Sequence, residues 1–106
     1  MAQLSYILWT CANLQEAQRI IHHLLQRRLI ACASILPDVT SIYTWQGKIE
    51  TAQEAKVILK TEAQKFDAVC TLIREQASYE ISEISQINTV NCNPQYLEWV
   101  VQETLV

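Results

Sequence analysis

One stretch of the chain, residues 40–50, reads TSIYTWQGKIE and contains the only glycine of the sequence, Gly47. Glycine adopts the positive φ angles of a tight turn at little cost, and the residues on both sides are mostly β-branched or aromatic. The stretch therefore predicts the tip of a β-hairpin. Strand-forming sequence continues on both sides, over residues 34–45 and 47–61, with a break expected near residues 52–53.

The arms of this hairpin are long for a single small domain. At ~3.3 Å per residue a strand of about twelve residues reaches ~40 Å, whereas a compact chain of this size has a radius of gyration of ~13 Å. We therefore expect the hairpin to project beyond its own core and to pair with another subunit. Tyr43 and Trp45, close to Gly47, would then anchor that subunit.

The composition is typical of a single globular domain that spans residues 1–106. Half of the residues are hydrophobic, which is enough to bury a core without disulfides. The four cysteines contain no Cys-x-x-Cys pair, so we expect a reducing, cytoplasmic location. The first residues lack the pattern of a signal peptide, and no window has the length of a membrane span. A net charge of -3 argues against nucleic acid as a partner.

Hydrophobic periodicity and capping residues predict the order of the other elements. The apolar run 4–10 predicts a central strand. Asn13 and Glu16 form a variant of the capping box before a first helix, and Thr61 with Gln64 repeats this signature before a second. The helical faces expected to be buried are Ala17, Ile20, Ile21, Leu24 and Leu25 in the first helix, Phe66, Val69, Cys70 and Ile73 in the second, and Leu97, Val100, Val101 and Leu105 in a terminal helix.

Further signals complete the fold. Pro37 predicts a bend or bulge in the outgoing arm of the hairpin, because proline cannot donate to a ladder. Residues 81–87 predict a short strand, and Asn93 with Pro94 predicts the start of the terminal helix. The fold class is thus α+β, a ferredoxin-like βαββαβ antiparallel sheet with both main helices on one face, plus a short carboxy-terminal helix. The opposite face and a long edge stay uncovered, which predicts a symmetric oligomer.

Several motifs across nearly the whole chain resemble those of the CutA divalent-cation tolerance proteins. They are Thr10–Asn13, Ala31–Cys32 with Pro37, Thr40–Tyr43, Trp45, Gly47–Glu50, Tyr79–Ile84 and Asn93–Trp99. The resemblance implies a homotrimer whose long hairpins join neighbouring sheets, a role in tolerance of copper and other divalent metals with at most weak Cu²⁺ binding, and no enzymatic activity. Tyr96 and Trp99 are expected at the oligomer interface with the hairpin tip.

Because trimers of this family look like PII regulators, the resemblance also implies an alternative. The protein would then be a scaffold or signalling trimer that holds a small molecule or an unidentified partner protein in the clefts between subunits. The segment around Tyr79 and Glu80 resembles the part of the family that lies near these clefts.

The resemblance further indicates where a metal would bind. Cys11 matches a candidate copper ligand of the family, and Glu83 lies close to an acidic one. Ala77 stands where the family usually has a histidine, so one of three ligands is missing. Cys92 replaces a glycine that is usual before the Asn-Pro pair. Two roles remain open for Cys11: backbone amides at a strand-to-helix junction can lower the pKa of a thiol for metal binding, or the side chain can pack as a small apolar group.

An enzyme with Cys11 as nucleophile is a third hypothesis. Such a thiol needs a nearby base, and the only histidines, His22 and His23, lie roughly 15 Å along the predicted helix from its start. We therefore assign no catalytic residue.

Overall fold

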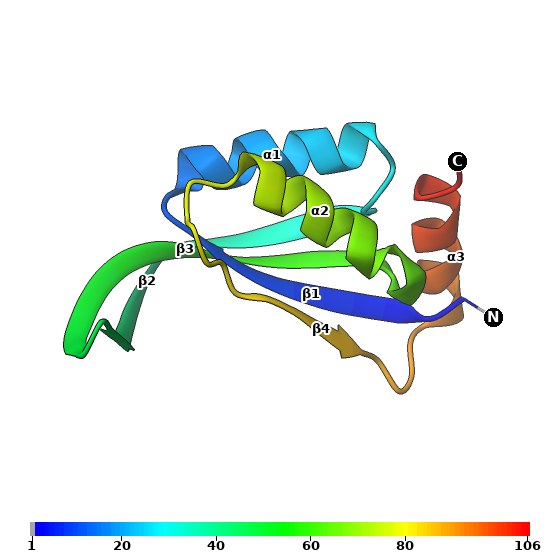
Figure 1. Ribbon diagram of the computed structural model, residues 1–106. Coiled ribbons are helices and arrows are strands. Elements are labelled where there is room, and N and C mark those ends of the chain that lie inside the picture. The colour runs from blue at the N-terminus through cyan, green and yellow to red at the C-terminus, as the bar shows by residue number, and fades with distance from the viewer. Residues whose placement is uncertain (1) are drawn as a thin grey trace.

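Four antiparallel strands form one sheet, and two helices cover one of its faces (Figure 1). The computed structural model describes residues 2–106. The strand order β2-β3-β1-β4 confirms the predicted ferredoxin-like α+β fold. The elements are β1 (Leu4–Cys11), α1 (Leu14–Gln26), β2 (Cys32–Trp45), β3 (Lys48–Glu62), a short 3₁₀ turn η1 (Ala63–Lys65), α2 (Phe66–Gln76), β4 (Ile84–Asn88) and α3 (Pro94–Glu103).

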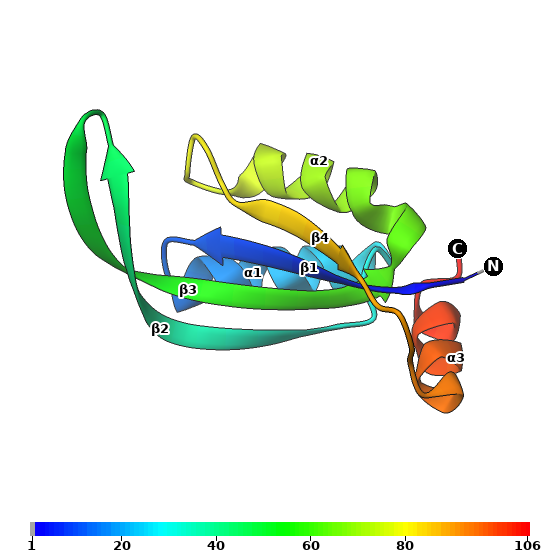
Figure 2. The same cartoon turned by 90° about the horizontal axis from the view of Figure 1, so that it is seen from below.

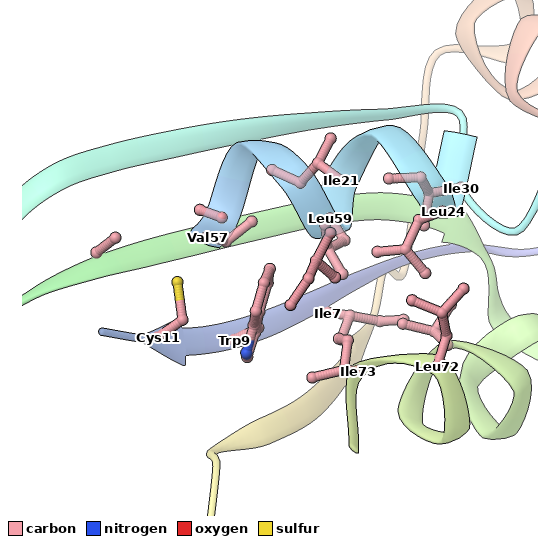
Figure 3. Packing of buried hydrophobic residues seen from close by; sticks show 14 residues of the cluster. Ile7, Trp9, Cys11, Ile21, Leu24, Ile30, Val57, Leu59, Leu72 and Ile73 are labelled. Atoms are coloured by element: carbon pink, nitrogen blue, oxygen red, sulfur yellow. The ribbon is translucent and has the colours of Figure 1, made fainter. Parts of the chain in front are cut away.

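The core lies between the two central strands and the helices α1 and α2 (Figure 3). Alternate residues of each strand point to the helical face, as the period of two requires. These buried residues are Ile7, Trp9 and Cys11 in β1 and Ala55, Val57 and Leu59 in β3. The predicted helical stripes are largely confirmed: Ala17, Ile20, Ile21 and Leu24 of α1, and Val69 and Ile73 of α2, are buried, whereas Leu25 is exposed and Cys70 only half-buried.

The predicted cap of α1 is confirmed in its first half. The side chain of Asn13 accepts a hydrogen bond of 2.8 Å from the backbone N–H of Glu16. The carboxylate of Glu16 does not return this bond to Asn13 and instead accepts from the N–H of Ser78, at 3.1 Å. Because Ser78 lies just beyond α2, this contact holds the loop between α2 and β4 against the start of α1.

The hairpin tip is a two-residue turn in which both central residues have positive φ, 51° at Gln46 and 81° at Gly47. This is the pattern of a type I′ turn, which matches the twist of the two strands. The irregularity expected at Pro37 is confirmed, because the pairing of β2 with β3 shifts between Leu36 and Val39. The break expected near residues 52–53 is wrong. Both residues pair with β2, so β3 continues without interruption.

The capping signature predicted at Thr61 is also wrong. Thr61 pairs with Ser5 inside the sheet, and its hydroxyl donates to the carbonyl of Leu29 at 2.7 Å. The strand therefore continues to Glu62, and α2 begins after the turn η1 without a side-chain cap. Pairing with β1 overrides the local signal, because the ladder continues through Glu62 and the hydroxyl of Thr61 is engaged with the carbonyl of Leu29 instead of capping a helix.

The last two elements are shorter or less buried than predicted. The expected strand over residues 81–87 begins only at Ile84. Asn93 caps α3 by accepting from the N–H of Gln95, as predicted. Of the predicted stripe of α3 only Val100 is fully buried, because α3 packs on the end of the sheet beside Leu4 and Ala31 instead of lying across a face (Figure 1).

The hairpin extends past the helices and curves away from the helical layer (Figure 1). The chain is consequently elongated, with extents of 45 × 27 × 21 Å. Seen from below, the sheet face opposite α1 and α2 is open, and α3 covers only its far end (Figure 2). The open sheet face and the projecting hairpin are therefore the parts of the fold that α1 and α2 leave uncovered.

Candidate functional site

A cavity of about 480 Å³ lies beside the hairpin, on the open side of the sheet. The hairpin contributes Ser41, Tyr43, Trp45, Glu54 and Lys56 to its lining. These side chains share one face, because the register pairs odd residues of β2 with even residues of β3 in this region, for instance Tyr43 with Glu50 and Trp45 with Lys48. Ala55 and Val57 are fully buried, so the other face of β3 packs against the helices.

The opposite wall comes from the loop between α2 and β4 and from the end of β1. It contains Thr10, Tyr79, Glu80, Ile81 and Glu83. The contact of Ser78 with Glu16 fixes the start of this loop, and the backbone N–H of Thr10 donates to the carbonyl of Glu83 at 3.3 Å near its end. One bond to a side chain and one bond between main-chain groups therefore hold this loop in place as the second wall of the cavity.

Lys56, Thr10 and Glu83 form a polar cluster in this cavity. Thr10 and Lys56 are register partners in β1 and β3. The ammonium of Lys56 pairs with Oε1 of Glu83 and also donates to the hydroxyl of Thr10 at 3.1 Å. The Thr10 hydroxyl donates to the same carboxylate oxygen at 3.0 Å. These contacts, the hydrogen bond from Lys56 first, hold the pKa of Glu83 below its usual range.

Glu54 and Tyr79 form a second pair. Glu54 is only 8% exposed, and its Oε2 accepts a hydrogen bond of 2.6 Å from the hydroxyl of Tyr79. Burial, together with the bond to the Glu54 carboxylate, raises the pKa of Tyr79 above its ordinary value. The phenol therefore stays protonated at physiological pH and acts as a hydrogen-bond donor.

The structure does not bring the predicted metal ligands Cys11 and Glu83 together. Cys11 is fully buried and points to the helical side (Figure 3), where its thiol donates to the carbonyl of Asn13 at 3.5 Å. Glu83 contacts Thr10 and Lys56, whose side chains project to the other face of the sheet. Adjacent residues of a strand point to opposite faces, so the sheet itself separates the two groups.

The environment of Cys11 also disfavours the thiolate form that metal binding requires. Burial, with a smaller contribution from Glu16, raises the pKa of its thiol to about 11. Of the two roles left open for Cys11, the structure therefore favours packing as a small apolar group, because burial raises the pKa of the thiol more than the backbone contact with Asn13 lowers it. Ala77, at the family's histidine position, ends α2 and packs against the core. Within residues 2–106, no three His, Cys, Asp or Glu side chains gather in a metal-binding group.

The predicted interface residues fall at opposite ends of the molecule. Tyr43 and Trp45 are 42% and 44% exposed beside the Gly47 turn. Tyr96 and Trp99 lie on α3, with ring centroids 5.8 Å apart. Tyr96 also contacts Cys32, at 3.3 Å between hydroxyl and sulfur. The four aromatic residues therefore do not form one continuous surface within a single chain (Figure 1).

Sequence reasoning found Tyr79, Glu80 and Glu83 but missed Glu54 and Lys56. Residues 55–60 alternate between apolar and polar side chains with the exception of Ile58, and this pattern indicates only that Lys56 faces away from the core. The available signal was the composition of that face, where two ionisable residues stand between Ala52 and Ile58. Their partners lie 25 and 27 residues further along the chain, which no local pattern reveals.

With this geometry established, comparison with known proteins assigns the family. A model of the CutA1 divalent ion tolerance protein matches residues 5–103. The chain belongs to this family. A CutA protein of Pyrococcus horikoshii is 35% identical over 95 residues, covering 90% of this chain and 92% of its own. Protein CutA of mouse is 37% identical over 95 residues, and the chain spans 54% of that relative's length.

Solved CutA structures have the same fold. CutA1 of Ehrlichia chaffeensis superposes with a TM-score of 0.95 at 31% identity, covering 100% of this chain and 99% of its own. The structure described as the periplasmic CutA of Archaeoglobus fulgidus has a TM-score of 0.93 at 33% identity, with 95% and 98% covered. The CutA family is named for divalent ion tolerance and not for a catalysed reaction. In residues 2–106, no helix is both long enough and apolar enough to span a membrane.

Proposed function

We propose that this protein is a homotrimer that acts in divalent-cation tolerance without catalysing a reaction. The observation that carries the proposal is the exposure of two large apolar side chains near the hairpin tip. Ile42 and Ile49 are 70% and 80% exposed, on the face opposite to the cavity. Large apolar side chains at such exposure favour a covering partner.

The geometry also favours a ring. The projecting hairpin, made of β2 and β3, and the opposite edge strand β4 are different surfaces, so contact between the hairpin of one subunit and the β4 edge of the next is heterologous. Heterologous contacts that close generate cyclic oligomers, and the resemblance to CutA sets the expected number at three. Such an assembly would bury the open edges that a single chain leaves unpaired.

Light scattering after size exclusion tests this assembly. We expect a trimer for the wild type and for a conservative Ile42→Val/Ile49→Val variant, and a monomer for Ile42→Asp/Ile49→Asp, because buried carboxylates would lack partners. Circular dichroism of the aspartate variant checks that the single chain still folds. A wild-type monomer at nanomolar concentration would overturn the proposal.

We propose that the role in metal tolerance does not depend on a Cys11 thiolate. The thiol is buried, and the sheet separates it from Glu83. Binding of Cu²⁺ is then weak and confined to exposed groups. In a copper titration we expect Cys11→Ala to bind as the wild type does, whereas a clear loss of binding in this variant would restore the thiol as a ligand. The proposed cytoplasmic location rests on the cysteines, all four of which are free.

The cavity supports a second candidate function, a trimeric scaffold or signalling protein that holds a small molecule. Its volume of about 480 Å³ lies within the usual range of ligand pockets, ~300–1,000 Å³. Native mass spectrometry of protein isolated gently from cells tests this function. A bound small molecule of constant mass supports it, and a trimer that never carries one argues against it.

A further inference from the structure

The charges around the cavity are unbalanced. Three carboxylates line it, those of Glu54, Glu80 and Glu83, against one ammonium, that of Lys56. Lys56 is already paired with Glu83. The local excess of negative charge therefore rests on Glu54 and Glu80, and no lysine or arginine among the lining residues balances it.

Glu54 is the critical group, because it is more than nine-tenths buried. Its Oε2 accepts from Tyr79, whereas its Oε1 has no hydrogen-bond partner within residues 2–106. A neutral hydroxyl compensates a buried carboxylate only in part, since the desolvation of a charge requires a paired charge to offset it. Among the residues that line the cavity, no unpaired lysine or arginine is left to balance the charge of Glu54.

Three aromatic side chains line the same cavity as this carboxylate. Tyr43 and Trp45 come from the hairpin, and Tyr79 comes from the opposite wall. Aromatic rings attract cations through the negative charge of their faces, and tryptophan does so most strongly. A carboxylate combined with aromatic walls is a suitable environment for an ammonium or guanidinium group attached to an apolar body.

We propose that this cavity binds a small organic cation, with its charged group on Glu54 and its apolar part against Tyr43 and Trp45. This inference deepens the second candidate function, on which it rests, and it is independent of metal binding. An anion does not fit, because Lys56 is already engaged. A divalent metal does not fit either, because no group of three ligating side chains exists in the described residues.

The test is a charge series of three probes of nearly equal shape, measured by isothermal titration calorimetry on the wild-type protein. The probes are phenethylammonium, the neutral phenethyl alcohol and the anionic phenylacetate. We expect the ammonium to bind at least about tenfold more tightly than the alcohol, the ratio that a charge-assisted hydrogen bond of ~1.5 kcal/mol provides. Equal binding of the alcohol, stronger binding of phenylacetate, or no binding of the ammonium would overturn the proposal.

Variants then locate the site. Glu54→Gln keeps the shape and an oxygen for Tyr79 but removes the charge, so we expect it to weaken ammonium binding about tenfold or more. Trp45→Leu should weaken binding several-fold and serves as the second variant if Glu54→Gln does not fold. Glu75→Gln, at an exposed position of α2, is the matched control and should bind as the wild type does. Unchanged binding in both Glu54→Gln and Trp45→Leu would overturn the proposal.

A neighbouring subunit could supply the missing cation instead. In that case the wild-type trimer would not bind phenethylammonium, whereas the Ile42→Asp/Ile49→Asp monomer would, and this outcome refutes a small-molecule site. Measuring the oligomeric state of each sample by light scattering separates failure of the ligand proposal from failure of the proposed trimer.

Discussion

The two halves of β3 both pair with β2 and yet have different physical roles. From Ala55 to Glu62 the strand pairs with β1 on one side and with β2 over most of its length on the other, and the helices cover one of its faces. From Lys48 to Gln53 it has only β2 as a neighbour. We call these the rooted half and the projecting half. A two-stranded ribbon is marginally stable alone, so the comparison shows that local pairing forms a long strand whereas burial stabilises it.

The cavity lies where the two halves meet. Glu54 is the first residue beyond the ladder with β1, and Lys56 is the partner of Thr10 at the end of that ladder. Here the strand leaves the core and curves (Figure 2), and its Glu54 accepts a hydrogen bond from Tyr79 of the loop between α2 and β4. At this boundary β3 loses β1 as a neighbour, and residues of the loop between α2 and β4 contact Glu54 and Lys56 instead.

The largest expected effect tests the two halves directly. Leu59→Ala in the rooted half should lower the free energy of unfolding by about 2–5 kcal/mol, because it removes a fully buried side chain and leaves a cavity. Ile49→Ala in the projecting half should change the stability of the dissociated chain by no more than about 0.5 kcal/mol. Urea unfolding monitored by circular dichroism measures both. Equal losses in the dissociated chain would contradict the comparison.

A second variant removes a hydrogen bond at the end of the rooted half and should lower the stability of the fold. Thr104 donates a hydrogen bond of 2.8 Å to Oε2 of Glu62, and both residues are buried. Thr104→Val leaves this buried carboxylate without its donor and should cost about 1–3 kcal/mol, whereas Thr104→Ser should cost less because it keeps the hydroxyl. Thermal unfolding of the two variants side by side gives the difference. A valine variant as stable as the serine variant would show that the contact contributes nothing.

Two substitutions in the turn of the projecting half should change its stability in opposite directions. Nothing lies within 4 Å of a Cβ at Gly47, so Gly47→Ala is penalised only through its φ of 81° and should cost about 1 kcal/mol. Gln46→Gly relieves the φ of 51° at the neighbouring position and should stabilise the turn by up to about 1 kcal/mol. Amide hydrogen exchange near the tip detects both changes. Two shifts of the same sign would rule out the assigned turn geometry.

The smallest expected effect is the pH-dependent contribution to stability of the Glu83–Lys56 pair, which lies where the two halves of β3 meet. The pKa of Glu83 is lowered in the folded chain, so its pairing with Lys56 stabilises the fold above the unfolded pKa of ~4.3 and is lost as pH falls through the folded pKa. Because both groups are partly exposed, Glu83→Gln should cost only about 0.2–1 kcal/mol at pH 7. This cost should disappear in acid. Unfolding curves at pH 7 and pH 3 test it, with Glu75→Gln as a control expected to show no such change.

Much of the fold could be predicted because its signals are local. The glycine of the turn, the proline at the bulge and the asparagine caps each act on neighbouring backbone, and the structure confirms them at Gly47, Pro37, Asn13 and Asn93. The failure at Thr61 has the same origin. A capping signature is also local. At Thr61 the pairing with β1 overrides it, and the residues near Thr61 give no information about this distant partner.

The site could be predicted only in part. Tyr79, Glu80 and Glu83 were identified through resemblance, and all three line the cavity. Cys11 was a metal-ligand candidate through the same resemblance, but its side chain lies on the helical face of β1 and is buried in the core. Glu54 gave no signal, because a carboxylate in an alternating strand is usually exposed.

The sequence by itself determined the order of the elements, the turn at Gly47 and the alternation of side chains along each strand, because these depend on backbone preferences and a period of two residues. Only the tertiary structure decided which face the helices cover. That choice places Cys11 in the core and Glu83 beside Lys56 on the opposite side of the sheet. Alternation requires that adjacent residues of a strand point to opposite faces, but the packing of α1 and α2 decides which of the two faces is buried.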